Sequence, residues 1–341
     1  MLRRLLSPVR LATAGVVLLA VAAFLLLTGR SDKFMEVPDV AHPLAGLVEV
    51  PGARPAQKRG GIYYVDVLIK RASLLQSTFS FLRPEGADLI PSQAFLPCGI
   101  SYSQELNLED QTMTASQQTA SAVALRTLGY KVHARDTGVR VVSVDRHSHA
   151  HGVLLPDDVV VAANGNRVHD RLDLFHVVAK VRVGQPITLK VRRKGTLRSL
   201  RVRTIADRCS PQQRAIIGFV PFDETDVKLP FKIDFNLRDV GGPSAGLAFA
   251  LEVLEKRGHD VDHGLKIAAT GELNLDGSVT QIGGVKQKTI GARRAGVDAF
   301  LVPVDGDNAK DARRYAHGLR IVPVKSFQQA LQALATLGGN A

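Results

Sequence analysis

The sequence predicts an α/β domain in the C-terminal part of the chain, a smaller β-rich domain before it and one apolar helix at the N-terminus. Strands and helices alternate from residue 215 onward, which is the pattern of an α/β domain. Short strands and turns fill residues 137–204, with Asn164-Gly165 as a strong hairpin signal. Residues 11–29 carry no charge and are almost wholly apolar.

The bulk composition indicates a globular protein of more than one domain. The chain has 341 residues, of which 45% are hydrophobic and 22% charged. Its formal net charge is +12, but the basic residues are spread along the chain, and it has no Trp and no zinc-finger spacing. We therefore expect no nucleic-acid partner, and we expect the charge to favour anionic lipid headgroups.

The N-terminal apolar run predicts a single transmembrane helix. Residues 11–29 would be roughly 28 Å long as a helix, close to the hydrocarbon thickness of a bilayer. Arg3, Arg4 and Arg10 precede the run, so we expect a cytoplasmic N-terminus, a location in the cell membrane and an extracytoplasmic body. A cleaved signal peptide is the less favoured alternative, because the run is long for one.

The domain limits that we predict follow these changes in composition and in the pattern of strands and helices. They are residues 1–30 for the tail and anchor, 31–130 for a linker and N-terminal α/β region, 131–208 for the β-rich domain and 215–341 for the α/β domain. Within the second part, residues 31–55 are expected to be a linker, 61–70 a strand and 103–128 a helix. Cys98 and Cys209 either form a disulfide or are two buried thiols, and the sequence leaves this open.

The β-rich segment resembles a PDZ domain of the bacterial protease type. The resemblance rests on GVRVVSV at 138–144, on SHAHGVLLPDDVVVAANGNRV after it, and on a helix at 171–181 followed by two strands. One departure is Asp157, where the family usually has Gly. The resemblance implies that an extended peptide adds as a strand between residues 138–144 and the helix. The groove residues would be Gly138, Val139, Val141 and Phe175; a packing module without a ligand is the alternative.

A serine stands where a Gly/Pro turn opens a helix predicted over 244–256. The segment is GGPSAG at 241–246. Gly242 allows a close backbone approach to a substrate carbonyl, and Pro243 suits the first turn of a helix. The free amide groups of a helix N-terminus are natural donors for an oxyanion. On its own, however, this segment is an ordinary helix start.

Two lysines follow a second Gly-Gly turn, in IGGVKQK at 282–288. A serine hydroxyl is a poor nucleophile until a base takes its proton, and a desolvated lysine can be that base. Burial and the positive end of a helix both lower the pKa of a lysine. The two segments together predict a Ser–Lys peptidase, with Lys286 interpreted as a solvated surface charge.

These segments resemble the Lon protease domain. GGPSAG, TGELNLDGSV, IGGVKQKTIGARRAGV and LVP occur in order between residues 221 and 303. The resemblance implies that Ser244 is the nucleophile and Lys288 the base, and that the Thr270 hydroxyl helps to position the lysine. With the anchor and the PDZ-like segment, the chain resembles the membrane-anchored PDZ–Lon peptidases of bacteria. It departs from Lon proteins at Gly241, where they commonly carry Asp.

The resemblance also sets the expected partners. No Gly-x-x-x-x-Gly-Lys-Ser/Thr run occurs in the sequence, so we expect ATP-independent cleavage of unfolded or accessible protein segments, without a cofactor or metal. A ring-shaped hexamer is implied by resemblance only. The alternatives are a non-catalytic PDZ scaffold with a degenerate peptidase domain and an esterase built on Gly-x-Ser-x-Gly. His147, His149 and His151 are interpreted as a polar loop rather than a zinc or nickel site.

Overall fold

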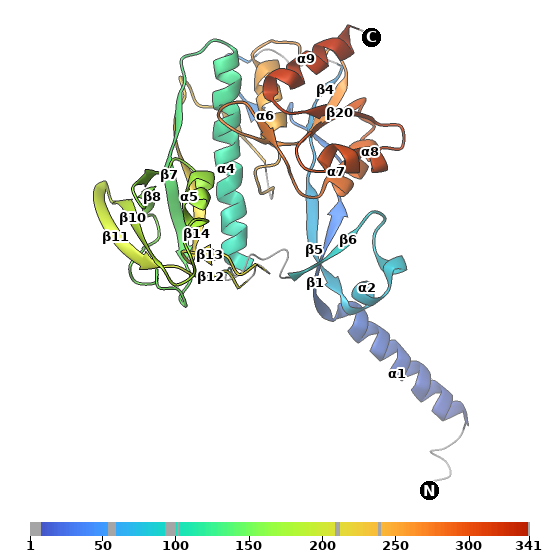
Figure 1. Ribbon diagram of the computed structural model, residues 1–341. Coiled ribbons are helices and arrows are strands. Elements are labelled where there is room, and N and C mark those ends of the chain that lie inside the picture. The colour runs from blue at the N-terminus through green and yellow to red at the C-terminus, as the bar shows by residue number, and fades with distance from the viewer. Residues whose placement is uncertain are drawn as a thin grey trace.

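The computed structural model describes residues 8–53, 59–92, 100, 102–208, 212–237 and 240–339. Cys98 and Cys209, whose pairing the sequence left open, lie outside these residues. The long helix α4 (Tyr102–Thr127) stands between a β-rich unit on one side and an α/β unit on the other (Figure 1). The α/β unit is built from both the N-terminal and the C-terminal parts of the chain.

A five-stranded sheet forms the centre of the α/β unit, in the order β2-β4-β16-β19-β20. Strands β4, β16, β19 and β20 run parallel, and the short β2 pairs antiparallel with β4. Every residue of β19 is buried, as expected for a central parallel strand covered on both faces. The strand bounds are β2 His42–Pro43, β4 Gly61–Tyr64, β16 Lys266–Ala269, β19 Ala299–Pro303 and β20 Arg320–Val324.

Strand β4 is the reason why the α/β unit does not coincide with residues 215–341. Its side chains alternate between half-buried and buried, and Ile62 and Tyr64 enter the same core as helix α6. Strand β4 pairs on one side with β2, which precedes it, and on the other side with β16, which follows some two hundred residues later in the chain. The N-terminal region is therefore part of the α/β unit.

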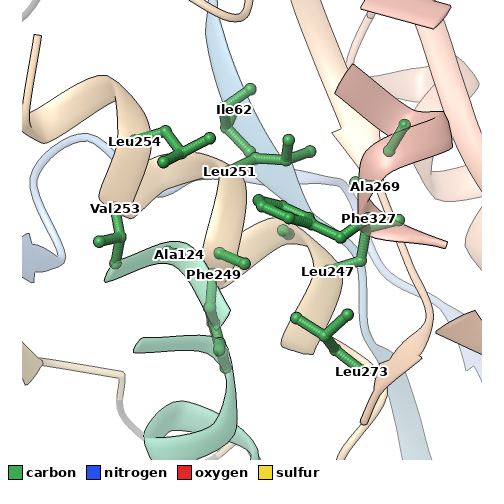
Figure 2. Close-up of a cluster of buried hydrophobic side chains, with 14 of the residues drawn as sticks. Ile62, Ala124, Leu247, Phe249, Leu251, Val253, Leu254, Ala269, Leu273 and Phe327 are labelled. Carbon is green, nitrogen blue, oxygen red and sulfur yellow. The ribbon is translucent and has the colours of Figure 1, made fainter. Parts of the chain in front are cut away.

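Helices cover this sheet, and the apolar positions of α6 make the core. Leu247, Phe249, Leu251 and Leu254 are all buried and pack with Ile62 of β4 (Figure 2). Helix α4 supplies Met113, Ala120 and Ala124 to the same cluster. The helix bounds are α6 Gly246–Lys256, α7 Val285–Arg294, α8 Asn308–Tyr315 and α9 Phe327–Gly338.

The β-rich unit is an antiparallel sheet in the order β11-β10-β8-β7-β14, with its own core. The predicted Asn164-Gly165 turn is present, with positive φ values of 47° and 82°. Asp157 also has a positive φ, 67°, a conformation that suits the Gly expected there. The bounds are β7 His133–Val144, β8 Val159–Ala163, β9 Asn166–Arg167, α5 Arg171–Val178, β10 Pro186–Arg193, β11 Thr196–Arg203 and β14 Phe219–Lys228.

The expected linker at 31–55 contains strands instead. Strand β1 (Arg30–Pro38) pairs on both sides, with β5 (Val67–Ser73) and β6 (Asp88–Pro91). Phe34, Met35 and Val37 are buried there, and this burial outweighs the Pro and Gly content that suggested a linker. The remaining short elements are β3 Val48–Glu49, α2 Leu74–Thr78, η2 Ser80–Leu82, β12 Ile205–Ala206, β13 Ala215–Ile216, β15 Asp234–Phe235, β17 Glu272–Leu273 and β18 Val279–Thr280.

The predicted transmembrane anchor is wrong. The apolar run lies in α1 (Pro8–Thr28), which projects from the rest of the chain (Figure 1), but no helix among the described residues is long and apolar enough to cross a membrane. Residues 12–15 of α1 (ATAG) are small or polar, and such residues add little to the free energy of transfer into a bilayer. The predicted cell-membrane location depended on this anchor, so the structure does not support it either.

The core of the α/β unit gives the first prediction. Leu251 is fully buried against α4 and β4, so Leu251→Ala should lower the free energy of unfolding by about 2–5 kcal/mol. Urea denaturation followed by circular dichroism measures this. The matched control is Leu172→Ala, since Leu172 is 61% exposed. Equal stability of the two variants would contradict the packing described.

Candidate active site

Ser244 lies in the turn that precedes α6. Gly242 has a φ of 83°, which only a glycine adopts without strain, and this bends the chain so that Ser244 faces α7. The helix begins at Gly246, two residues later than predicted. Ser244 is therefore held in a tight turn at the N-terminal end of a buried helix.

Lys288 is placed by the second Gly-Gly turn. Gly284 precedes α7 with a φ of 67°, and a side chain at this position would come within 2.7 Å of Val67 Cγ2. The Lys288 amide donates to the Gly284 carbonyl at 2.9 Å, in the first turn of the helix. The side chain is 4% exposed, which is exceptional for a lysine.

The two side chains meet directly. Lys288 Nζ donates a hydrogen bond to Ser244 Oγ over 2.7 Å, although 44 positions separate the two residues in the chain. Burial lowers the pKa of Lys288 to about 8, while the carboxylates of Asp66, Glu109 and Glu36 act in the opposite direction. Lys288 forms no ion pair within the described residues, so a large share of the amine is neutral near pH 8.

Thr270 holds the nucleophile turn by its backbone. Its Oγ1 donates to the Ser244 carbonyl oxygen at 3.0 Å, and the amide of Gly271 donates to the same oxygen at 2.8 Å. The resemblance implied that this hydroxyl positions the lysine. In the structure the Thr270 hydroxyl donates to the backbone of Ser244 instead, so it positions the serine rather than the lysine.

Helix α4 clamps the same turn at two points, and sequence reasoning missed it. The amide of Gly242 donates to the Glu109 carbonyl at 3.0 Å, and Ser116 Oγ donates to the Pro243 carbonyl at 3.1 Å. Positions 109 and 116 are two helical turns apart and share one face of α4. One indication of this contact was present in the sequence, namely polar residues recurring at this spacing in the predicted helix. The same pattern is typical of a helix face in contact with solvent, so it did not identify the contact.

The clamp changes which amides can serve an oxyanion. Gly242 and Pro243 were the expected positioning or oxyanion residues, but the Gly242 amide is already hydrogen-bonded to α4 and a proline has none. The amides of Ser244 and Ala245 make no hydrogen bond among the residues that the structure describes. These two groups, just before α6, are the available donors.

Lys286 points away from this site. Its Nζ forms an ion pair with Asp88 Oδ1 at 2.6 Å and lies 5.6 Å from the centre of the Tyr315 ring. Gln287 Nε2 donates to the other oxygen of Asp88 at 2.9 Å. These contacts attach α7 to β6 and hold the Lys286 side chain away from Ser244.

A cavity of about 740 Å³ opens next to the serine turn. It lies between α4, helix α5, strand β14 and the β17–β18 hairpin, and Pro243 belongs to its wall. Phe175 and Phe222 supply apolar surface, while Glu272 supplies charge. The volume is large enough for several residues of an extended peptide.

Strand β7, which carries three of the four predicted groove residues, has no free edge in the structure. Gly138, Val139 and Val141 lie on β7, which pairs with β8 on one side and with β14 on the other, so no peptide can add to β7. Within the described residues, the open edge beside α5 belongs to β14. The sequence could not show this, because β14 follows the predicted end of the β-rich domain. Phe175 remains on the groove side, 47% exposed and lining the cavity.

Two other clusters in the described part of the chain bring three possible metal ligands within 4.8 Å of one another. They are Asp39, His42 and Asp66, and Glu255, Asp260 and Asp262. The Glu255 carboxylate already accepts hydrogen bonds from the amides of Val261 and Asp262. We assign no ion to either group, and the loop histidines at 147, 149 and 151 belong to neither.

Comparisons with known proteins agree with this geometry. Residues 238–336 match the family of the Lon protease (S16) C-terminal proteolytic domain, and residues 127–204 match the PDZ domain family. The chain combines a Lon-type proteolytic domain with a PDZ domain. This confirms the resemblance to PDZ–Lon peptidases, and it confirms that the C-terminal domain is of the serine endopeptidase type.

The chain is similar to only part of each relative. It is 35% identical to the Lon protease of Clostridium beijerinckii over 130 residues, which are 37% of this chain and 16% of the relative. For the Lon protease of Mycoplasma pneumoniae the identity is 38% over 106 residues, 28% of this chain and 13% of the relative. The PDZ domain of the SdrC-like protein of Listeria monocytogenes has 19% identity and a TM-score of 0.24, covering 25% of this chain and 87% of that one; a score this low carries no structural argument.

The buried lysine gives the second prediction. The pKa of Lys288 falls from 10.5 in the unfolded chain to about 8 in the folded protein, so between these pH values the unfolded state binds more protons and stability rises with pH. Below pH 8 both states are protonated, and burying the charged Lys288 amine lowers the free energy of unfolding by its full amount, about 3 kcal/mol. Lys288→Met should therefore be more stable than the parent at pH 7, by a margin that shrinks towards pH 10. Denaturation at pH 7 and pH 10 measures this margin, and a margin independent of pH would contradict the lowered pKa.

Proposed function

We propose that this protein is an ATP-independent serine endopeptidase that uses Ser244 as nucleophile and Lys288 as general base. The single observation that supports this most directly is the 2.7 Å hydrogen bond between a buried lysine amine and a serine hydroxyl. A lysine with a pKa of about 8 is neutral often enough to accept a proton near physiological pH. The match to the Lon proteolytic domain supports the same reaction class.

The proposed reaction has two steps. Ser244 Oγ attacks the peptide carbonyl while its proton passes to Lys288 Nζ, and the lysine ammonium then protonates the leaving amine to leave an acyl-enzyme. A water molecule, deprotonated by the neutral lysine, hydrolyses the ester and frees the serine. The amides of Ser244 and Ala245 are the groups placed to stabilise the oxyanion, each contributing about 3 kcal/mol.

The substrates that we propose are unfolded or accessible protein segments. The cavity beside the serine turn lies between the PDZ and Lon-type domains and has the size of a short extended peptide. The 341 residues contain no phosphate-binding Gly-x-x-x-x-Gly-Lys-Ser/Thr run that would support ATP-driven unfolding. A substrate would therefore need to reach the cavity already extended.

Digestion of unfolded casein without nucleotide is the third prediction and the test of this function. The full chain should cleave it, Ser244→Ala should lower the rate by at least about a thousandfold, and Lys288→Met should do the same, since removing either partner of a nucleophile–base pair abolishes activation. The parent's kcat/KM should rise with pH to a plateau above an apparent pKa near 8.

The matched control is Lys286→Met, in the same helix and half-buried, but paired with Asp88 rather than with Ser244. It should keep activity within a few-fold of the parent. Failure of the parent to cleave casein or peptides would end the enzyme proposal and favour a non-catalytic PDZ scaffold. Cleavage of small esters but no peptide would favour an esterase.

We further propose that the open edge of β14 recruits the substrate chain as an added strand. The amide and Nε of Arg171, at the start of α5, bind the Asp223 carboxylate of β14 at 2.6 and 2.7 Å, which holds the helix beside that edge. Main-chain pairing with such an edge gives affinity, and neighbouring pockets give selectivity.

Phe175→Ala is the fourth prediction. It should raise KM for casein severalfold and leave kcat for a short fluorogenic peptide unchanged, because the side chain lines the cavity without touching Ser244. Leu155→Ala is the control, since Leu155 is similarly exposed (45%) and is absent from the cavity wall. An equal effect of both variants, or none, would contradict recruitment through this groove.

A further inference from the structure

Glu109 of α4 occupies the space directly over the nucleophile turn. A Cβ atom at Gly241 would lie 2.8 Å from Glu109 Cβ and 3.3 Å from its Oε2, and one at Gly242 would lie 2.6 Å from the same oxygen. Cβ atoms essentially never come so close to other atoms. The two glycines therefore leave room for a carboxylate that arrives from another part of the chain.

The Glu109 carboxylate also acts on the catalytic amine. It is one of the three carboxylates whose charge raises the pKa of Lys288 against the effect of burial; the other two are Asp66, which follows β4, and Glu36 on β1. Burial raises the pKa of Glu109 itself, and Lys288 lowers it. The Glu109 side chain makes no hydrogen bond or ion pair with any described residue, so its charge is not neutralised by a nearer partner.

Glu109 differs from the other two carboxylates because it also holds the serine turn. Its carbonyl accepts a hydrogen bond from the Gly242 amide at 3.0 Å, and two turns further along α4 the Ser116 hydroxyl donates to the Pro243 carbonyl at 3.1 Å. The backbone of this one residue thus holds the turn that carries Ser244, and its carboxylate acts electrostatically on Lys288. Glu105, one turn before, is a neighbouring carboxylate whose own pKa is raised by burial and by the charge of Glu109, and it does not act on the pKa of Lys288.

We propose that Glu109 is a positioning residue of the Ser–Lys pair. Its backbone fixes the Gly241-Gly242 turn, and its carboxylate stabilises the ammonium that forms when the Ser244 proton moves to Lys288 Nζ. The acid expected at position 241 is absent because Glu109 fills its place from α4. The inference rests on the proposed peptidase function.

The pH profile of Glu109→Gln is the fifth prediction. The amide keeps the shape of the side chain and the backbone bond to Gly242, and removes only the charge. The acid limb of kcat/KM should move to lower pH by roughly half a unit, and the plateau should fall at least about threefold, because an amine whose ammonium form is less stabilised is a weaker proton acceptor. Asp110→Asn, which removes a charge from the exposed face of the same helix, should leave both unchanged. Superimposable profiles for Glu109→Gln and the parent would overturn the proposal.

A paired substitution tests the placement of the carboxylate. Gly241→Asp alone should lose activity because its Cβ overlaps that of Glu109, and Glu109→Gly alone should lose at least about threefold, as Glu109→Gln does, because the charge is missing. Together they restore one carboxylate to the same space, so the double variant should be more active than either single variant. A double variant no more active than the better single variant would overturn the shared position.

A measurement independent of turnover separates this inference from the proposed function. In protein labelled with ¹³Cε-lysine, the Lys288 signal is the one absent from Lys288→Arg, and its titration midpoint should lie near 8 in the parent and lower in Glu109→Gln. If the chain cleaves nothing and the midpoint still falls, the enzyme proposal fails and the electrostatic role of Glu109 stands. An unchanged midpoint rejects the role of Glu109 whether or not the chain is active.

Discussion

The contact between a buried amine and a serine hydroxyl is the constraint on which the rest of this structure depends. In the proposed reaction, Lys288 can act as a base only if water is largely excluded from its amine. Excluding water from a lysine destabilises the fold unless the surrounding chain is held firmly. Three carboxylates lie close enough to oppose the desolvation without forming an ion pair. The amine therefore stays between full charge and full neutrality, which is the state that a general base near neutral pH requires.

Rigidity around this contact comes from segments far apart in the chain. Thr270 and Gly271 hold the carbonyl of Ser244, while Glu109 and Ser116 hold the two residues before it. Helix α7 is fixed to β6 through Asp88, which keeps the direction of Lys288 constant. Because each of these anchors belongs to a different element, the site exists only when the N-terminal and C-terminal parts of the chain are packed together.

The position of the PDZ domain follows from the same packing. It is inserted between α4, which clamps the serine turn, and β15, which returns the chain to the α/β unit. Strand β14 closes the PDZ sheet on the side of α4 and leaves its own edge beside the cavity. A peptide held at that edge would lie close to Pro243, so recruitment and cleavage would share one space.

The sequence by itself determined the choice of Ser244 and Lys288 as candidate partners, the glycine turns before them and the order of strands and helices after residue 244, because these depend on local chemistry and short-range periodicity. It also indicated the PDZ-like segment, although it did not show that β14 pairs with the strand of the predicted groove, and its apolar N-terminal run led to an anchor that the structure does not support. Only the tertiary structure decided that β4 belongs to the α/β unit and that Glu109 and Ser116 touch the serine turn. Such contacts join residues more than a hundred positions apart, and no local pattern encodes which distant surface a polar helix face will meet.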